Sequence, residues 1–442
     1  MTVPSDHAAD PARLSASEAA RRIAEGSLTS EALVRACLAR IEEREPLIRA
    51  WAAIDPDDAI ERARAADAAT PAGPLHGVPF GVKDIFDTAE LPTGYGSPLY
   101  EGHQPERDSG AVAALREAGA LVLGKTVTTE FAFRTPGPTR NPHQPEHTPG
   151  GSSSGSAAAV ADGMVPIALG SQTGGSTIRP GAFCGIFAFK PTYGFVNSDG
   201  VHPLATALDT VGWFARSIED LALVGAVLST TQSAALDAPA QPLRIGVVRT
   251  PEWGRVSPAG QRAIEETAAA ITAAGGQVSD LDLPSECDGL GDAWDVIVAA
   301  GAASAFATEY RDSSDGLSPA LRELIEAGHA LGAAERSEAE SLALHCRAAV
   351  SETFAQVDAF LTPSAPGEAP AGIATTGDPL CNRVWTLLRL PCVALPAGTG
   401  EGGLPVGVQL VGRHGGDQSL LELASAVADL LPGPAFPGDG GA

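Results

Sequence analysis

The amino-acid sequence predicts an α/β protein. Short apolar runs of strand length, at residues 121–123, 165–169 and 243–248, alternate with longer alanine-rich segments whose apolar residues have helical spacing. Hydrophobic residues make up 44% of the 442 residues, which suffices for a sizeable core. Length alone allows about three domains, yet a large α/β fold can take up a whole chain, so we expect one domain over residues 1–442.

Residues 1–70 predict helices at the N-terminal end that pack behind the sheet. Ser15 and Glu18 have the spacing of a capping box, and apolar residues recur at helical spacing over residues 29–42. A third, alanine-rich helix is predicted over residues 56–69, because proline occupies its first position.

Residues 71–230 form the next part of the predicted core and hold most of the motifs. A proline and glycine break opens it, and the expected elements then follow in order: a strand ending near Lys83, a helix over 108–118, a strand at 121–123, a proline-rich loop over 136–149, a small-residue helix over 157–163 and a strand at 165–169.

Residues 231–355 are expected to be a variable region with a helical cap, residues 356–431 the C-terminal part of the core, and residues 432–442 a disordered tail. The elements expected here are strands at 243–248, 358–363, 392–396 and 407–412, a strand beginning at 277, helices over 258–275 and 418–431, and a run of helices over 291–354 interrupted at 313–316.

Composition excludes several classes of protein. The net charge of −25 argues against a surface for nucleic-acid phosphates and indicates a solvated acidic exterior. Six scattered cysteines include no close pair of the metal-knuckle type, so we expect free thiols and no bound metal. Neither a signal-peptide core nor a run of about 20 apolar residues occurs, and the expected location is cytoplasmic.

Two serine turns stand out at residues 150–156 and 174–177. In both, paired glycines precede serine, so the turn exposes a hydroxyl together with bare backbone N–H groups. The helix and strand between them are short enough for the two serines to face each other. This combination is typical of acyl transfer.

A nucleophilic serine needs a base, and lysine is the better candidate here than His76 or His202. The chain has 29 lysines and arginines together, of which only Lys83, Lys125 and Lys190 are lysine. Arginine cannot lose its proton, whereas lysine can. Lys83 lies in an apolar stretch that would lower its pKa; structural ion pairs are expected for the other two.

With these features, the chain resembles the amidase signature hydrolases, which use a Ser, cis-Ser, Lys triad. The resemblance covers roughly residues 15–230 and 355–430. Its motifs are Gly77-Val78-Pro79 with Val82-Lys83-Asp84, Gly124-Lys125-Thr126, Asn141-Pro142, Thr148-Pro149-Gly150-Gly151-Ser152-Ser153, Thr173-Gly174-Gly175-Ser176, Phe183-Cys184-Gly185, Lys190-Pro191-Thr192 and Leu404-Pro405-Val406-Gly407-Val408-Gln409-Leu410.

The resemblance implies a three-layer α/β/α sandwich around a large mixed β-sheet, and it implies a role for each matching residue. Ser176 would be the nucleophile, Ser152 the cis-serine proton bridge and Lys83 the general base. The oxyanion hole would consist of the N–H groups of Thr173, Gly174, Gly175 and Ser176. Ser153 and Asp84 would support the site, and no cofactor is implied.

Three departures from the commoner family pattern bear on the substrate. They are Ser154 after the first serine pair, Gln172 where many members have aspartate, and Thr177 inserted before Ile178 and Arg179. The last two favour small-molecule aryl amides, anilides or carbamates, as in an aryl acylamidase or urethanase, over glutamine. Four aromatic residues are candidates for the pocket wall: Tyr95, Phe131, Phe133 and Trp385.

Two alternatives stay open. One is the glutamine amidase subunit of a tRNA-dependent amidotransferase, which would need a partner protein, although the acidic chain has no evident basic patch for tRNA. The other is a binding protein with a silent site, which the intact Lys83, Ser152 and Ser176 disfavour. The main interpretation has a small-molecule substrate, no nucleic acid and no membrane, and leaves a homodimer open.

Overall fold

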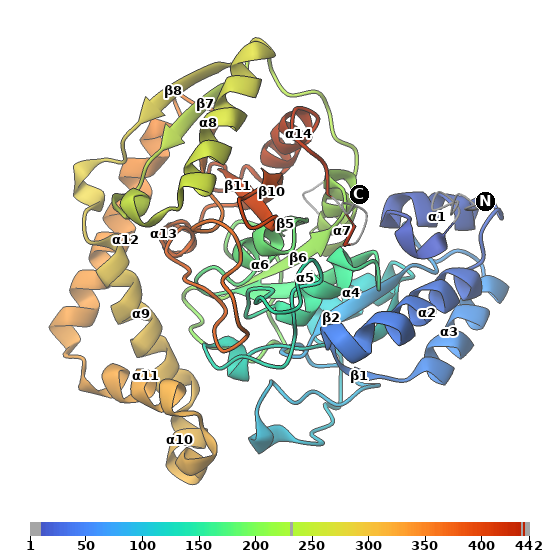
Figure 1. The fold of residues 1–442 in the computed structure, drawn as a ribbon. Coiled ribbons are helices and arrows are strands. Elements are labelled where there is room, and N and C mark those ends of the chain that lie inside the picture. The colour runs from blue at the N-terminus through green and yellow to red at the C-terminus, as the bar shows by residue number, and fades with distance from the viewer. Residues whose placement is uncertain (1–9, 230–232, 435, 438–442) are drawn as a thin grey trace.

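The computed structural model describes residues 10–229, 233–434 and 436–437. Parts of two predictions, the absent signal peptide at residues 1–9 and the disordered tail at residues 435 and 438–442, lie outside the described residues. Within them, eleven strands form one mixed sheet in the order β1-β3-β2-β4-β6-β5-β10-β11-β9-β7-β8 (Figure 1).

The strands are β1 (Trp51–Ile54), β2 (Pro79–Lys83), β3 (Leu121–Thr126), β4 (Ile167–Gln172), β5 (Phe187–Lys190), β6 (Thr210–Ala215), β7 (Arg244–Val248), β8 (Gln277–Leu281), β9 (Ala359–Pro363), β10 (Cys392–Thr399) and β11 (Pro405–Val411). Strand β2 pairs in parallel with β3 and β4, and β7 pairs in parallel with β8 and β9. The middle of the sheet, from β4 to β9, is antiparallel.

The helices are α1 (Ala16–Ala24), α2 (Ser30–Ile48), α3 (Pro56–Ala68), α4 (Gly110–Glu117), α5 (Ser154–Ala161), α6 (Ile178–Phe183), α7 (Ile218–Leu228), α8 (Pro258–Ala273), α9 (Leu290–Ala305), α10 (Ala307–Ser313), α11 (Pro319–Ala330), α12 (Ala333–Thr353), α13 (Arg383–Leu387) and α14 (Asp417–Ala428).

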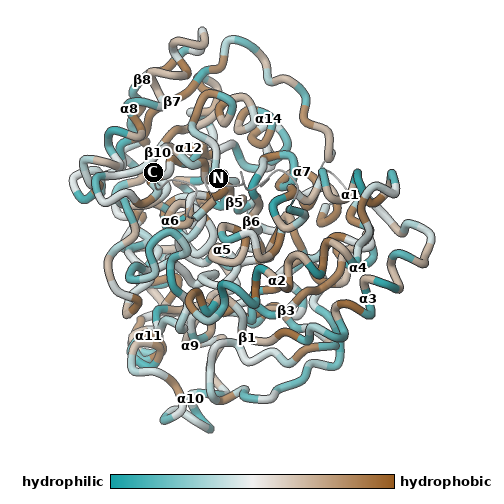
Figure 2. The backbone as a smooth tube through the Cα atoms, turned by 45° about the vertical axis from the view of Figure 1, so that its right-hand side comes forward, coloured by the Kyte–Doolittle hydropathy of each residue, from teal (hydrophilic) through white to brown (hydrophobic). Residues whose placement is uncertain are grey.

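The predicted α/β class with a large mixed sheet is confirmed. Every residue of β2, β4 and β11 is buried, and strands buried along their whole length have both faces covered. Hydrophobic segments gather toward the interior, and hydrophilic ones lie along the periphery (Figure 2). No single helix of the described chain is long and apolar enough to span a membrane. One bent pair of helical segments, Ser285–Ala305 with Ala307–Gly316, has the length and the apolar composition of a span when the two are taken together.

The N-terminal helices α1 and α2 begin directly after the predicted capping residues. The side chains of Ser15 and Thr29 accept hydrogen bonds from backbone N–H groups of the first turns of α1 and α2. Helix α2 runs to Ile48, six residues past the predicted end, and it contains Pro46 in its last turn. Helices α9 to α12 lie on the opposite side of the molecule from α1 to α3 (Figure 1).

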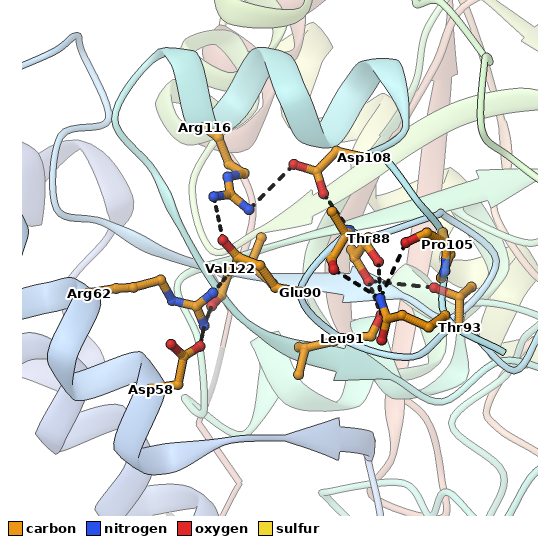
Figure 3. A network of polar contacts seen from close by, with 12 residues as sticks. Asp58, Arg62, Thr88, Glu90, Leu91, Thr93, Pro105, Asp108, Arg116 and Val122 are labelled. Atoms are coloured by element: carbon orange, nitrogen blue, oxygen red, sulfur yellow. Dashed lines mark hydrogen bonds and ion pairs between the residues drawn. The ribbon is translucent and has the colours of Figure 1, made fainter. Parts of the chain in front are cut away.

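A polar network fixes the segment that follows the strand of Lys83 (Figure 3). Arg62 on α3 donates a hydrogen bond of 3.1 Å to the carbonyl of Val122 on β3 and pairs with Glu90. Arg116 on α4 pairs with the same glutamate and, at 3.4 Å, with Asp108. Two helices and a strand therefore anchor this segment beside the carboxyl edge of β2.

Candidate active site

Two neighbouring parallel strands bring the predicted lysine and a serine to one edge of the sheet. Strand β2 ends at Lys83, and β4 ends with Ser171 and Gln172. Since Val82 pairs with Leu169 in parallel register, the carboxyl ends of the two strands coincide. Open α/β sheets bind their ligands at such carboxyl edges, so chemistry is expected here.

The Lys83 side chain is completely buried at this edge. Its Nζ atom lies 2.8 Å from Ser152 Oγ and 2.8 Å from Ser171 Oγ. Burial away from water disfavours the ammonium form and holds the pKa of Lys83 well below its usual range. Two residues predicted for the triad are thus in contact. Lys83 also contacts Ser171, a residue that no sequence pattern had indicated.

The turn that carries Ser152 is held tightly. Gly150 has a φ of 85°, and a side chain there would collide with the backbone of a neighbouring segment. The peptide bond between Gly151 and Ser152 is cis. The carbonyl of Gly151 accepts a hydrogen bond of 2.7 Å from Nη2 of the buried Arg179. Because Arg179 follows Ser176 by three residues, it ties the two serine turns to each other.

The second turn, residues 173–176, offers unpaired backbone donors. Within the part of the chain that the structure describes, the N–H groups of Gly174, Gly175 and Ser176 have no hydrogen-bond partner. Free N–H groups beside a serine hydroxyl are what a developing oxyanion requires. Ser176 is 8% exposed, and no hydrogen bond joins it to Ser152 among the described residues.

Two carbonyl groups of the same turn are held from different elements. The Thr173 carbonyl accepts a hydrogen bond of 3.0 Å from Nε1 of Trp294 on α9. The Gly174 carbonyl accepts one of 2.9 Å from Oγ1 of Thr386 on α13. The helical cap and the C-terminal part of the core therefore both position this turn.

An aspartate that no sequence pattern had singled out lies behind the site. Asp209 accepts a hydrogen bond of 2.6 Å from Thr173 Oγ1 and two more from the backbone N–H groups of Leu204 and Ala205. Burial raises the pKa of Asp209 to about 6, against the effect of these hydrogen bonds. Its negative charge in turn opposes the lowering of the Lys83 pKa.

A pocket of about 660 Å³ opens above Ser176. Its polar floor is the turn of residues 173–176 together with Arg179, whose Nη1 is buried and has no hydrogen-bond partner among the residues that the structure describes. Apolar walls come from distant segments; their residues include Ala132, Phe133, Leu204, Trp294, Val298, Pro370 and Pro379. A volume of this size suits a small molecule.

Of the four aromatic residues predicted for the pocket, only Phe133 lines it. Tyr95 and Phe131 belong to an aromatic cluster around His202, whose ring centroid lies 4.7 Å and 4.9 Å from theirs. Trp385 is completely buried and packs against a core phenylalanine, with 5.8 Å between ring centroids. The assignment of these three residues to the pocket is corrected, because their side chains pack in the interior of the protein. Trp294 of α9 is the aromatic wall residue that the prediction missed.

The two residues predicted to support the site lie close to it in different ways. Ser153 is buried, and its Oγ pairs at 3.3 Å with the backbone N–H and carbonyl of Ser171. Asp84 turns away from Lys83, since its Oδ1 lies 3.3 Å from Nζ of Lys125. Lys190, also expected to form an ion pair, instead donates to the carbonyl of Pro191 at 2.8 Å.

Comparisons with known proteins show which proteins this chain resembles in sequence and in fold. A family model described as Amidase matches residues 32–421. The chain is 35% identical to the A subunit of glutamyl-tRNA(Gln) amidotransferase from Roseiflexus castenholzii, over 94% of this chain and 95% of that protein. Its fold matches a crystal structure of an amidase (TM-score 0.87, 32% identity, 95% of this chain and 100% of the other). It also matches native peptide amidase from Stenotrophomonas maltophilia (TM-score 0.81, 28% identity, 97% and 99%).

Proposed function

Because this chain belongs to the amidase family, we propose that it hydrolyses the C–N bond of a small-molecule amide or carbamate through an acyl-enzyme on Ser176. The observation that carries the proposal is the contact of the buried, desolvated Lys83 amine with Ser152 at 2.8 Å, in a molecule whose pocket has Ser176 at its floor. An amine with a lowered pKa can accept a proton near neutral pH.

In the acylation step, Ser176 Oγ attacks the substrate carbonyl carbon. Its proton passes to Ser152, whose own proton passes to neutral Lys83, while Ser171 accepts a hydrogen bond from the amine and orients it. The unpaired N–H groups of the turn stabilise the negative charge on the carbonyl oxygen. When the C–N bond breaks, the relay returns the proton to the leaving amine.

Deacylation uses the same groups with water as the nucleophile. Water adds to the ester carbon of acyl-Ser176 and gives a proton to the relay, and the Ser176 Oγ bond to the acyl carbon breaks. Ser176 regains its proton from Ser152, and the acid leaves. With substrate and one water molecule, every proton transfer in the two steps is made by Ser176, Ser152 and Lys83.

The apolar walls support an aryl or similarly apolar substituent on the substrate. Phe133 and Trp294 come from segments far apart in the sequence, and Leu204 and Val298 add to the apolar lining. Aromatic walls of this kind hold flat groups by burial and ring contacts. Aryl amides, anilides and aryl carbamates are therefore the first class of substrate to test.

Glutamine is a second candidate substrate, and the sequence comparisons favour it over the aryl class. Several similar proteins are named as A subunits of glutamyl-tRNA(Gln) amidotransferases, and that name implies assembly with other subunits. The pocket also carries groups of both charges, Arg179 at its floor and Asp378 at its rim, as an amino acid would require. On this hypothesis the chain acts with a partner that receives the ammonia.

One panel experiment separates the candidates. The purified chain is assayed with glutamine, a primary peptide amide, an anilide and an aryl carbamate, alongside Ser176→Ala. Release of arylamine by the wild type but not by the variant would support the aryl class. Glutamine hydrolysis alone, or activity only after another protein co-purifies, would support the amidotransferase hypothesis. Turnover that persists in Ser176→Ala would overturn the proposed nucleophile.

A further inference from the structure

Behind the active-site turn, the side chains of Thr386 and Gln172 form a chain of hydrogen bonds that reaches the pocket only through the backbone of Gly174. Thr386 is 1% exposed and is absent from the pocket walls. Its Oγ1 lies 2.9 Å from the carbonyl oxygen of Gly174 and 3.2 Å from that of Asn382, and it accepts a hydrogen bond of 3.0 Å from Nε2 of Gln172. The Thr386 hydroxyl therefore connects Gln172 with the turn.

The direction of these hydrogen bonds follows from what Gln172 binds at its other end. Gln172 Oε1 accepts from the backbone N–H groups of Thr177 and Ile178, at 2.9 Å and 3.0 Å. Since two donors fix the oxygen, the amide nitrogen faces Thr386 and donates to it. The hydroxyl has one proton of its own, and Gly174 is its nearer acceptor.

Fixing the Gly174 carbonyl also fixes the N–H group of Gly175. The peptide bond between them is trans, and in a trans peptide the C=O and N–H bonds point in opposite directions. The Gly175 N–H is among the donors without a partner in the described chain. A rotation of this peptide plane would turn that donor away from its position and leave the Gly174 carbonyl unpaired.

We propose that Thr386, oriented by Gln172, is a positioning residue that aims the Gly175 N–H at the substrate oxyanion; this rests on the function proposed above. It also gives a reason for glutamine at position 172. A carboxylate there could still accept from the two backbone N–H groups, but it has no proton to donate. The Thr386 hydroxyl would instead donate its hydrogen bond to this carboxylate, and the Gly174 carbonyl would lose its donor.

The test compares Thr386→Val, which keeps the shape but loses the hydroxyl, with Thr386→Ser, which keeps the hydroxyl. The valine variant should lower kcat about 10- to 100-fold, less than the roughly 10²–10³-fold expected for outright loss of an oxyanion donor. KM should stay within about twofold, because Thr386 does not contact the ground-state substrate. Thr386→Ser should retain most of the activity.

Gln172→Glu provides an independent variant should the valine protein fail to fold. It should lower kcat in the same way, and the double variant should be no slower than the slower single variant, because both act through one hydrogen-bond chain. The rate of Ser176 labelling by a fluorophosphonate, which develops charge in the same place, should fall in parallel. Far-UV circular dichroism checks that each protein is folded.

The outcomes separate this inference from the function on which it rests. A wild type that neither turns over the panel nor labels at Ser176 would overturn the proposed function, and this inference with it. An active wild type whose Thr386→Val and Gln172→Glu variants keep kcat and labelling rates within twofold would overturn the inference alone. So would an equal loss of kcat in Thr386→Ser and Thr386→Val.

Discussion

Two adjacent strands each bury a lysine completely, and the surroundings of the two amines differ. Lys83 on β2 contacts two hydroxyl groups, from Ser152 and Ser171, and has no carboxylate within ion-pair distance in the described chain. Lys125 on β3 lies 3.3 Å from Asp84 and donates to a backbone carbonyl at 2.6 Å. Burial lowers both pKa values, that of Lys125 only to about 8, since nearby carboxylates support its charge.

The partners of a buried lysine therefore decide its role more than its burial does. Hydroxyl groups can exchange protons with an amine. Because they carry no negative charge, they do not hold the amine in its charged form. A carboxylate holds the amine in its charged form, so that the pair becomes a structural connection. By this criterion Lys83 suits proton transfer, whereas Lys125 joins β3 to the segment after β2.

The strongest way to test this contrast is to remove the Lys83 amine. Lys83→Met should lower kcat/KM about 10²–10⁴-fold, the usual contribution of a general base. Lys83→Arg should be as inactive, because a guanidinium cannot give up its proton. Steady-state kinetics with the best substrate of the panel measures the effect. Activity of Lys83→Arg within tenfold of the wild type would refute the assignment of the base.

The matched change at Lys125 should affect stability instead. Lys125→Met leaves Asp84 buried without its cation, and breaking a buried ion pair costs about 3–5 kcal/mol. The free energy of unfolding, from denaturant titration, should fall by that order, while the folded protein keeps kcat within a few fold. If Lys125→Met were as inactive as Lys83→Met although folded, the two lysines would not have separate roles.

A smaller effect is expected from the charge behind the site. Ionised Asp209 favours the protonated form of Lys83, so Asp209→Asn should lower the Lys83 pKa further. Because the neutral amine is the active form, activity falls as pH drops through this pKa. The acid limb of the kcat/KM profile should therefore move to lower pH, by up to about one unit. A shift to higher pH would contradict the assigned interaction.

The fold was predictable wherever local signals were strong. Capping residues placed the starts of α1 and α2, and apolar runs placed β2, β3, β7 and β9 to β11. Strands β5 and β6 were not predicted, and their pairing with β10 and β4 depends on partners far away in sequence. Such pairings cannot be deduced from periodicity.

The site was predictable where chemistry is concentrated in short motifs, as for Lys83 and Ser152. Its supporting groups were not, because residues such as Ser171, Asp209 and Thr386 are common types without a spacing that marks them. The pocket walls come from loops and from the cap, so an aromatic residue in the sequence cannot be assigned to pocket or core. Trp294 lines the pocket, whereas Trp385 is buried in the core.

The ionisation state of each lysine tests the separate roles of Lys83 and Lys125 most directly. The chain has only three lysines, so a protein labelled with ¹³C at the lysine ε carbons gives three signals, assigned through Lys83→Met and Lys125→Met. In an NMR pH titration, Lys83 should show the chemical shift of a neutral amine at the pH of full activity, and Lys125 should titrate near pH 8. A charged Lys83 at that pH would contradict its role as the base.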